Sequence, residues 1–195
     1  TDCLNFRPVV QATNSGNVAA YASDCNYDGT NADGNIEVFR FDRRGGGRFT
    51  QVTNTTGDVA VLDSVDINRN GRYITYIAQD AVANYVIFRY DNNAGASSFM
   101  GQSRADRLPI SVQMIDNNNP NHIFYEALDL FNFSNVVSHI DISTQIVTDS
   151  SAISGTSGMA SALIGGAPHT FIAVTSDLIG SNGDGNLEIF QGRVE

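Results

Sequence analysis

The hexapeptide AAYASD at positions 19–24 decides how this chain is organised, because similar hexapeptides follow it at regular intervals. They are TYIAQD at 75–80, FYEALD at 124–129 and IAVTSD at 172–177. Each is an apolar run that ends in aspartate, and successive aspartates lie about fifty residues apart. A period of this length is typical of proteins built from repeated supersecondary units.

Further apolar runs surround each hexapeptide in the same order. A second run follows it, as IEVFRF at 36–41, VIFRY at 86–90, VVSHI at 136–140 and LEIF at 187–190. Other runs precede it at 8–12, 59–67, 109–115 and 159–164, and runs at 49–53, 99–102 and 145–148 close three of the units. All are short, separated by Gly, Asn and Asp, and without a helical period. The sequence therefore predicts an all-β chain with four strands per unit and almost no helix.

The expected architecture is a single-domain β-propeller of four four-stranded repeats, either four-bladed or part of a larger ring. The repeats are placed approximately at 7–53, 54–105, 106–150 and 151–195, and residues 1–6 are expected to supply a closing strand for the last one. Many runs are apolar on both faces, which is expected when blades pack face to face. A β-sandwich is the structural rival, but its strands would not repeat in sets of four.

Three phrases resemble the repeat of TolB-type, WD-like β-propellers. They are SDCNYDGTNADGNIEVF at 23–39, SVDINRNGRYI at 64–74 and NGDGNLEIF at 182–190. The resemblance implies the propeller fold and little about activity, because such propellers serve as protein-interaction modules, substrate gates and enzyme appendages.

Composition narrows the classes of partner. The chain has 195 residues, 11 of them basic and 21 acidic, and a formal net charge of −10. This charge repels phosphate backbones, so we expect no nucleic-acid partner. No apolar run approaches the length of about 18 residues that a membrane-spanning helix needs, so we expect no membrane insertion.

The two cysteines, Cys3 and Cys25, are too few for a disulfide scaffold and wrongly spaced for a zinc knuckle. In an antiparallel pair, the start of the strand at Pro8 and the end of the strand before Asp24 lie at the same end, and the cysteines flank those two points. Two free thiols are possible, but we predict a disulfide. Together with scarce lysine and frequent Asn-Gly-Asp turns, this favours a secreted, periplasmic or cell-surface protein.

The segment at 24–37 is the most informative for chemistry, because it begins with the pattern D-x-N-x-D-G. Calcium prefers six to eight oxygen ligands, which alternating acidic and amide side chains before a glycine turn can supply. The predicted ligands are Asp24, Asn26, Asp28, Asp33 and Glu37. The loop differs from an EF-hand, since its twelfth residue is Asn35 and strands flank it. A polar hairpin turn without metal is the alternative.

The corresponding loop of the fourth unit offers a weaker second calcium site, with Asp177, Asp184 and Glu188 as its ligands. It lacks the middle acids of the first loop.

Catalysis finds little support in the sequence. The stretch at 155–158 lacks the last glycine of a nucleophile elbow, and His122, His139 and His169 do not have the spacing of a zinc site. We therefore expect a calcium-binding module for a protein or glycan rather than an enzyme. The alternatives are a propeller enzyme or enzyme appendage acting on carbohydrate, and a structural repeat of a larger surface protein.

Overall fold

The chain is all-β in this computed structural model. The structure describes residues 3, 5–11, 17–44, 46–55, 61–80, 84–102, 106–115, 121–131, 135–149, 170–175 and 188–193. These residues form strands and turns, and none of them belongs to a helix that could cross a membrane. The chain divides into two compact units, Thr1–Gln102 and Ser103–Glu195, each of which is described by itself.

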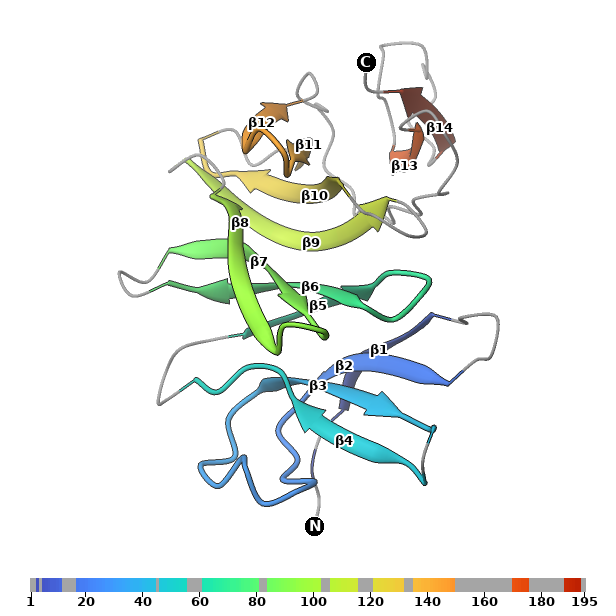
Figure 1. The fold of residues 1–195 in the computed structure, drawn as a ribbon. Coiled ribbons are helices and arrows are strands. Elements are labelled where there is room, and N and C mark those ends of the chain that lie inside the picture. The colour runs from blue at the N-terminus through green and yellow to red at the C-terminus, as the bar shows by residue number, and fades with distance from the viewer. Residues whose placement is uncertain are drawn as a thin grey trace. The chain divides into compact units, whose positions relative to one another are not determined.

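The first unit contains two four-stranded antiparallel sheets whose strands follow one another in chain order (Figure 1). The first sheet comprises β1 (Asn5–Gln11), β2 (Val18–Ser23), β3 (Glu37–Asp42) and β4 (Arg48–Gln51). The second comprises β5 (Val61–Ile67), β6 (Tyr73–Gln79), β7 (Tyr85–Asp91) and β8 (Ala96–Gln102). Each sheet is therefore a four-stranded meander, as the repeat of four runs predicts.

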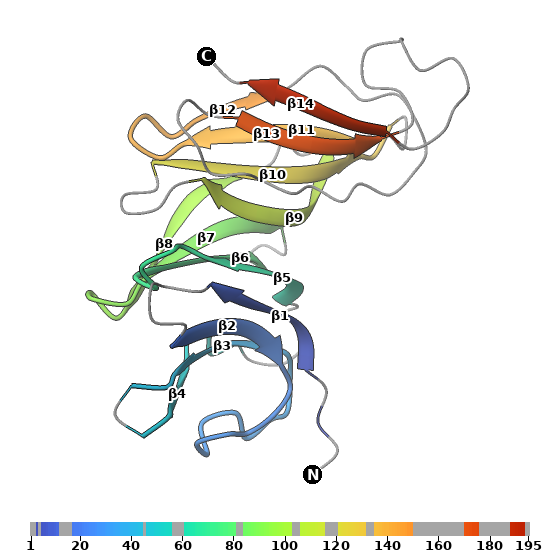
Figure 2. The ribbon, with the colours of Figure 1, turned by 90° about the vertical axis from the view of Figure 1, so that its right-hand side faces the viewer.

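The core of the first unit lies between these two sheets, which face one another in Figure 2. Small side chains of β2 contribute one side of this core, including Val18, Ala20 and Ala22. Larger side chains of the second sheet fill the other side, among them Ile67 and Ile74, which are fully buried. Because β2 offers mainly alanines here, the facing sheet can approach closely.

Gly71, in the turn between β5 and β6, shows how close this approach is. Its φ of +73° is a conformation that residues with a side chain rarely adopt. A Cβ atom placed there would lie 3.2 Å from a methyl carbon of Val18 on β2. The position is therefore restricted both by backbone conformation and by packing between the sheets.

The second unit contains a third four-stranded meander and a strand pair. The meander has the order β12-β11-β10-β9 and comprises β9 (Arg107–Ile115), β10 (His122–Asp129), β11 (Asn135–Asp141) and β12 (Ile146–Asp149). The pair comprises β13 (Thr170–Thr175) and β14 (Glu188–Arg193). The predicted run at 159–164 lies outside the described residues.

The N-terminal strand differs from the prediction. Asn5 and Phe6 pair with Ser23 and Ala22 of β2 in the first sheet, and closure of the last unit by residues 1–6 stays a prediction. The register of β1 shifts between Phe6 and Val9, where Pro8 lies. Since proline has no N–H to donate, it interrupts the ladder without ending the strand, and β1 begins before the proline rather than at it.

Candidate functional site

A disulfide fastens the loop that follows β2. Cys3 and Cys25 are bonded, with their Cα atoms 5.1 Å apart, as predicted. The pairing of Asn5 with Ser23 brings the two cysteines to the same end of the β1–β2 pair. The carboxylate of Asp24 lies beside the bridge, and its oxygen and the two sulfurs are all within 4.8 Å of one another.

Glu37 anchors the other end of this loop from inside the protein. Its side chain is fully buried, and the Thr53 hydroxyl donates to its Oε2. Its Oε1 accepts from the Thr55 backbone N–H at 2.5 Å and from the Thr55 hydroxyl at 2.7 Å. Both oxygens therefore bind the segment after β4.

Asn31 ties the centre of the loop together. It is 2% exposed, and its backbone N–H donates to Asn26 Oδ1 at 3.0 Å. Its side-chain Nδ2 donates to the backbone oxygens of Asn35 at 2.9 Å and Cys25 at 3.4 Å. Its Oδ1, however, accepts no hydrogen bond in the described part of the chain. A buried amide oxygen without a partner costs about 1–3 kcal/mol unless a donor or a cation satisfies it.

The tip of the loop holds the remaining predicted ligands. Asp28 accepts from the Thr30 N–H at 3.2 Å and from the Thr30 hydroxyl at 2.5 Å, and that hydroxyl also contacts Gln51 Oε1 on β4. Asp33 is exposed, next to Gly34 with its φ of +69°. Among the described residues, these carboxylates do not join Asp24 in a cluster of three.

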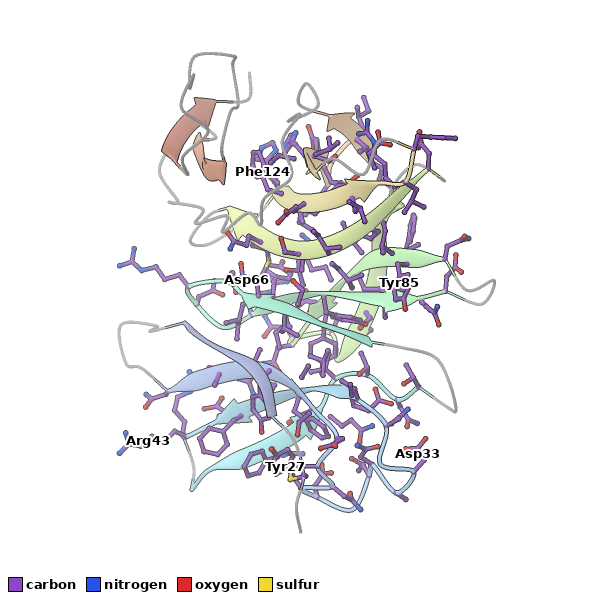
Figure 3. All side chains as sticks on the ribbon, turned by 180° about the vertical axis from the view of Figure 1, so that it is seen from behind. Tyr27, Asp33, Arg43, Asp66, Tyr85 and Phe124 are labelled. Atoms are coloured by element: carbon purple, nitrogen blue, oxygen red, sulfur yellow. A yellow bond between two sulfur atoms is a disulfide. The ribbon has the colours of Figure 1, made fainter. Side chains whose placement is uncertain are left out.

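An aromatic cluster fixes the loop against the first sheet, on the side away from the second sheet (Figure 3). Tyr27 of the loop stacks on Phe49 of β4, with ring centroids 4.5 Å apart and planes within 6°. Its edge meets Phe39 of β3 at 5.1 Å, and its hydroxyl lies 3.3 Å from that of Ser23. The loop is thus held at both ends, at its centre and along its face.

A second group of titratable side chains lies on one face of the third sheet. His122 and Glu126 lie on this face of β10 with Phe124, which Figure 3 labels, and His139 of β11 is the direct partner of Phe124. His122 Nδ1 and His139 Nε2 are 2.8 Å apart, a hydrogen bond that requires one shared proton. Sequence spacing did not reveal this pair, because only the strand register brings the two histidines together.

Glu126 is the other residue that sequence reasoning missed. It is 4% exposed, Ser111 donates to its Oε2 only at 3.4 Å, and its Oε1 accepts no hydrogen bond among the described residues. Burial raises its pKa from 4.5 to about 7, because the charged form loses hydration, and Ser111 only partly opposes this. Glu126 can therefore exchange a proton near neutral pH.

Several predicted positions have no described side chains. Asp177, Asp184, His169 and the stretch at 155–158 lie outside the described residues, and Glu188 is described only as the first backbone position of β14. The second calcium loop therefore stays a prediction.

Comparison with known proteins identifies the fold. No family model and no curated protein matches the sequence. Among solved structures, an oligogalacturonate lyase from Vibrio parahaemolyticus matches with a TM-score of 0.63 and 12% identity, over 96% of this chain and 53% of that one. An oligogalacturonate lyase in complex with manganese gives 0.65 and 11% over the same shares.

TolB from Acinetobacter baumannii matches with a TM-score of 0.57 and 16% identity, over 91% of this chain and 39% of that one. Identities this low show similarity of fold alone. The chain is therefore structurally similar to TolB-like and oligogalacturonate lyase β-propellers, and it spans about half or less of the length of these structures.

Proposed function

We propose that the chain is an extracytoplasmic binding module whose four-stranded units are propeller blades, four of them, in a complete ring or part of a larger one. Its loop at 24–36 would bind a protein or glycan ligand. The observation that carries this proposal is the anchoring of the loop, by the Cys3–Cys25 disulfide, the Glu37 network and the Tyr27 stack. A loop ordered before binding loses less conformational entropy when a ligand arrives.

Calcium in this loop is part of the proposal. Asp24, Asn26, Asp28 and Asp33 remain its candidate ligands, whereas Glu37 is engaged by Thr53 and Thr55. Support comes from Asn31, whose buried Oδ1 has no hydrogen-bond donor among the described residues. Amide and carboxylate oxygens are the ligands that calcium prefers. Binding requires the Asp28 and Asp33 carboxylates to turn toward the interior of the loop.

Calorimetric titration of chelator-treated protein with calcium tests the metal. We expect one equivalent to bind and the melting temperature to rise, since a ligand at a hundred times its Kd stabilises the native state by about 2.7 kcal/mol. The Asp28→Asn, Asp33→Asn double variant should lose both effects. Asp141→Asn, on the third sheet, is the matched control and should retain them. No heat and no change in melting temperature would remove calcium from the proposal.

Binding itself is tested by screening the intact protein on glycan and surface-protein arrays, with calcium and with chelator. A ligand retained by the native protein and lost on Tyr27→Ala would support the loop as the recognition surface. A ligand that binds the Tyr27→Ala variant as tightly as the native protein would show that recognition takes place elsewhere.

An enzyme acting on carbohydrate is the second candidate, favoured by Glu126. A carboxyl group with a pKa of about 7 can donate or accept a proton at physiological pH. Two of the structural neighbours are oligogalacturonate lyases. Incubation with oligogalacturonate, followed by ultraviolet detection of unsaturated products, tests this candidate. Activity that disappears in Glu126→Gln would favour it over the binding module.

A further inference from the structure

The disulfide and its neighbouring carboxylate form the only cluster of three metal-ligating side chains found among the described residues. Cys3 Sγ, Cys25 Sγ and one oxygen of Asp24 lie within 4.8 Å of one another. While the bridge is closed, its sulfurs are poor ligands, because metals bind the thiolate. Reduction would convert the same atoms into two thiols beside a carboxylate.

The strand pairing keeps these residues together without help from the disulfide. Asn5 and Phe6 pair with Ser23 and Ala22, immediately beside the two cysteines. The Cys25 backbone N–H donates to Ser23 Oγ at 3.0 Å, which also fixes the start of the loop. A Cα–Cα distance of 5.1 Å leaves room for two thiolates to share one ion. These backbone contacts would hold the two cysteines near one another after the bridge opens.

We propose that the reduced protein binds a thiophilic divalent metal ion, such as Zn²⁺, through Cys3, Cys25 and Asp24. Zinc bonds of about 2.3 Å to sulfur and 2.0–2.2 Å to oxygen place the ligands of a tetrahedral site roughly 3.4–3.8 Å apart, within the span of this cluster. Two thiolates favour zinc over calcium, which prefers oxygen alone. A water molecule would complete the coordination, because Cys3 and Asp24 are only partly buried.

Metal binding would follow reduction of the disulfide, in two steps. A dithiol reductant attacks the disulfide, and the products are two protein thiols and the oxidised, cyclic form of the reductant. The metal ion then replaces the two thiol protons, which pass to solvent, while Asp24 contributes its carboxylate. The metal closes the same connection between the N-terminal segment and the loop that the disulfide made. The site shares Asp24 with the proposed calcium site and none of that site's other candidate ligands.

The experiment compares oxidised protein with protein reduced by dithiothreitol and desalted without oxygen. We expect one equivalent of Co²⁺ to give an ultraviolet thiolate-to-metal absorption in the reduced protein only, and Zn²⁺ to displace it. The Cys3→Ser, Cys25→Ser double variant should lack this absorption. Asp24→Asn should weaken zinc binding at least about tenfold, the scale seen when even an outer partner of a metal site is removed.

Asp80→Asn is the matched control, because it removes the same charge from a turn of the second sheet and should leave zinc affinity unchanged. Reduced wild type that binds no tighter than the double cysteine variant would overturn the proposal. So would an Asp24→Asn variant with unchanged affinity. Circular dichroism shows whether reduction loosens the fold. If it does, one equivalent of zinc must restore the spectrum, and failure to restore it would also overturn the proposal.

Discussion

Two buried glutamates, Glu37 in the first sheet and Glu126 in the third, differ in the hydrogen bonds that their carboxyl groups accept. Glu37 accepts three hydrogen bonds, spread over both of its oxygens, from Thr53 and Thr55. Glu126 accepts one long bond from Ser111, at 3.4 Å. Both side chains are at most 4% exposed, so burial alone does not distinguish them.

The difference shows what makes a buried carboxylate structural. A carboxylate that loses water needs donors on both oxygens to stay charged at low cost. Glu37 has donors on both oxygens, because the chain after β4 continues alongside the first residues of β3, where Val52 and Thr53 donate to the Val38 carbonyl. Glu126 lies in mid-strand, where Ser111 is its one hydroxyl donor among the described residues, and burial raises its pKa to about 7. The first glutamate binds the segment after β4, whereas burial raises the pKa of the second to about 7.

Replacing Glu37 should give the largest effect. Glu37→Ala leaves the hydroxyls and the N–H of Thr53 and Thr55 without their acceptor and opens a cavity. We expect the free energy of unfolding to fall by about 4 kcal/mol, the scale for removing one partner of a buried charged interaction. Urea unfolding in calcium-free buffer measures it. Asp33→Ala, at an exposed carboxylate, is the control, and an equal loss there would contradict the assigned role.

Replacing Glu126 should change the pH dependence of stability. Between pH 4.5 and about 7 the folded state keeps a proton that the unfolded state releases, so stability falls as pH rises through this window. The loss is on the order of 3 kcal/mol, from about 1.4 kcal/mol per pKa unit. Glu126→Gln should remove this slope and be more stable than wild type at pH 8. A carboxyl NMR titration of Glu126 near 4.5 would refute the contrast with Glu37.

The donors can be tested as a matched pair. The Thr53 hydroxyl donates to Glu37 and accepts from the Val38 N–H at 2.7 Å. Thr53→Val keeps the shape of the side chain but leaves Glu37 Oε2 and the Val38 N–H without their hydrogen-bond partner. We expect it to lower the free energy of unfolding by about 2 kcal/mol. A loss near zero would mean that Thr55 alone suffices to hold Glu37.

Ser111→Ala should have the smallest effect. A hydrogen bond of 3.4 Å to a carboxyl that already holds its proton contributes little, so we expect a change below about 0.5 kcal/mol. The pKa of Glu126 should rise slightly, since the hydroxyl opposes the effect of burial. A loss as large as that of Thr53→Val would show that the two glutamates are held alike.

Much of the fold was predictable, because strand formation depends on local pattern. The four hexapeptides overlap β2, β6, β10 and β13, and the runs that follow them overlap β3, β7, β11 and β14. The Cys3–Cys25 bridge was predictable because antiparallel pairing brings the ends of β1 and β2 together. The start of β1 was not, since a proline can end a strand or merely interrupt its ladder.

The site was harder to predict, because its contacts depend on register. Glu37 was expected to face a metal, yet its partners follow a different strand and are revealed only by where β4 ends. The approach of His122 to His139 requires the β10–β11 register, and a shift of one residue would separate them. Asn31 was not among the predicted ligands, and it is buried by hydrogen bonds to Cys25 and Asn35 at the two ends of the loop.

Gly71 gives the first unit an unexpected kind of rigidity. The absence of a side chain at this turn lets the two sheets approach closely there, because even one methyl group would press on Val18. A substitution there would strain the backbone at a φ of +73° and would also require the Val18 side chain to move by a few tenths of an ångström. Homologues should therefore keep glycine at position 71, or change positions 18 and 71 together. Joint changes at these two positions would indicate that homologues have inherited this packing of the two sheets.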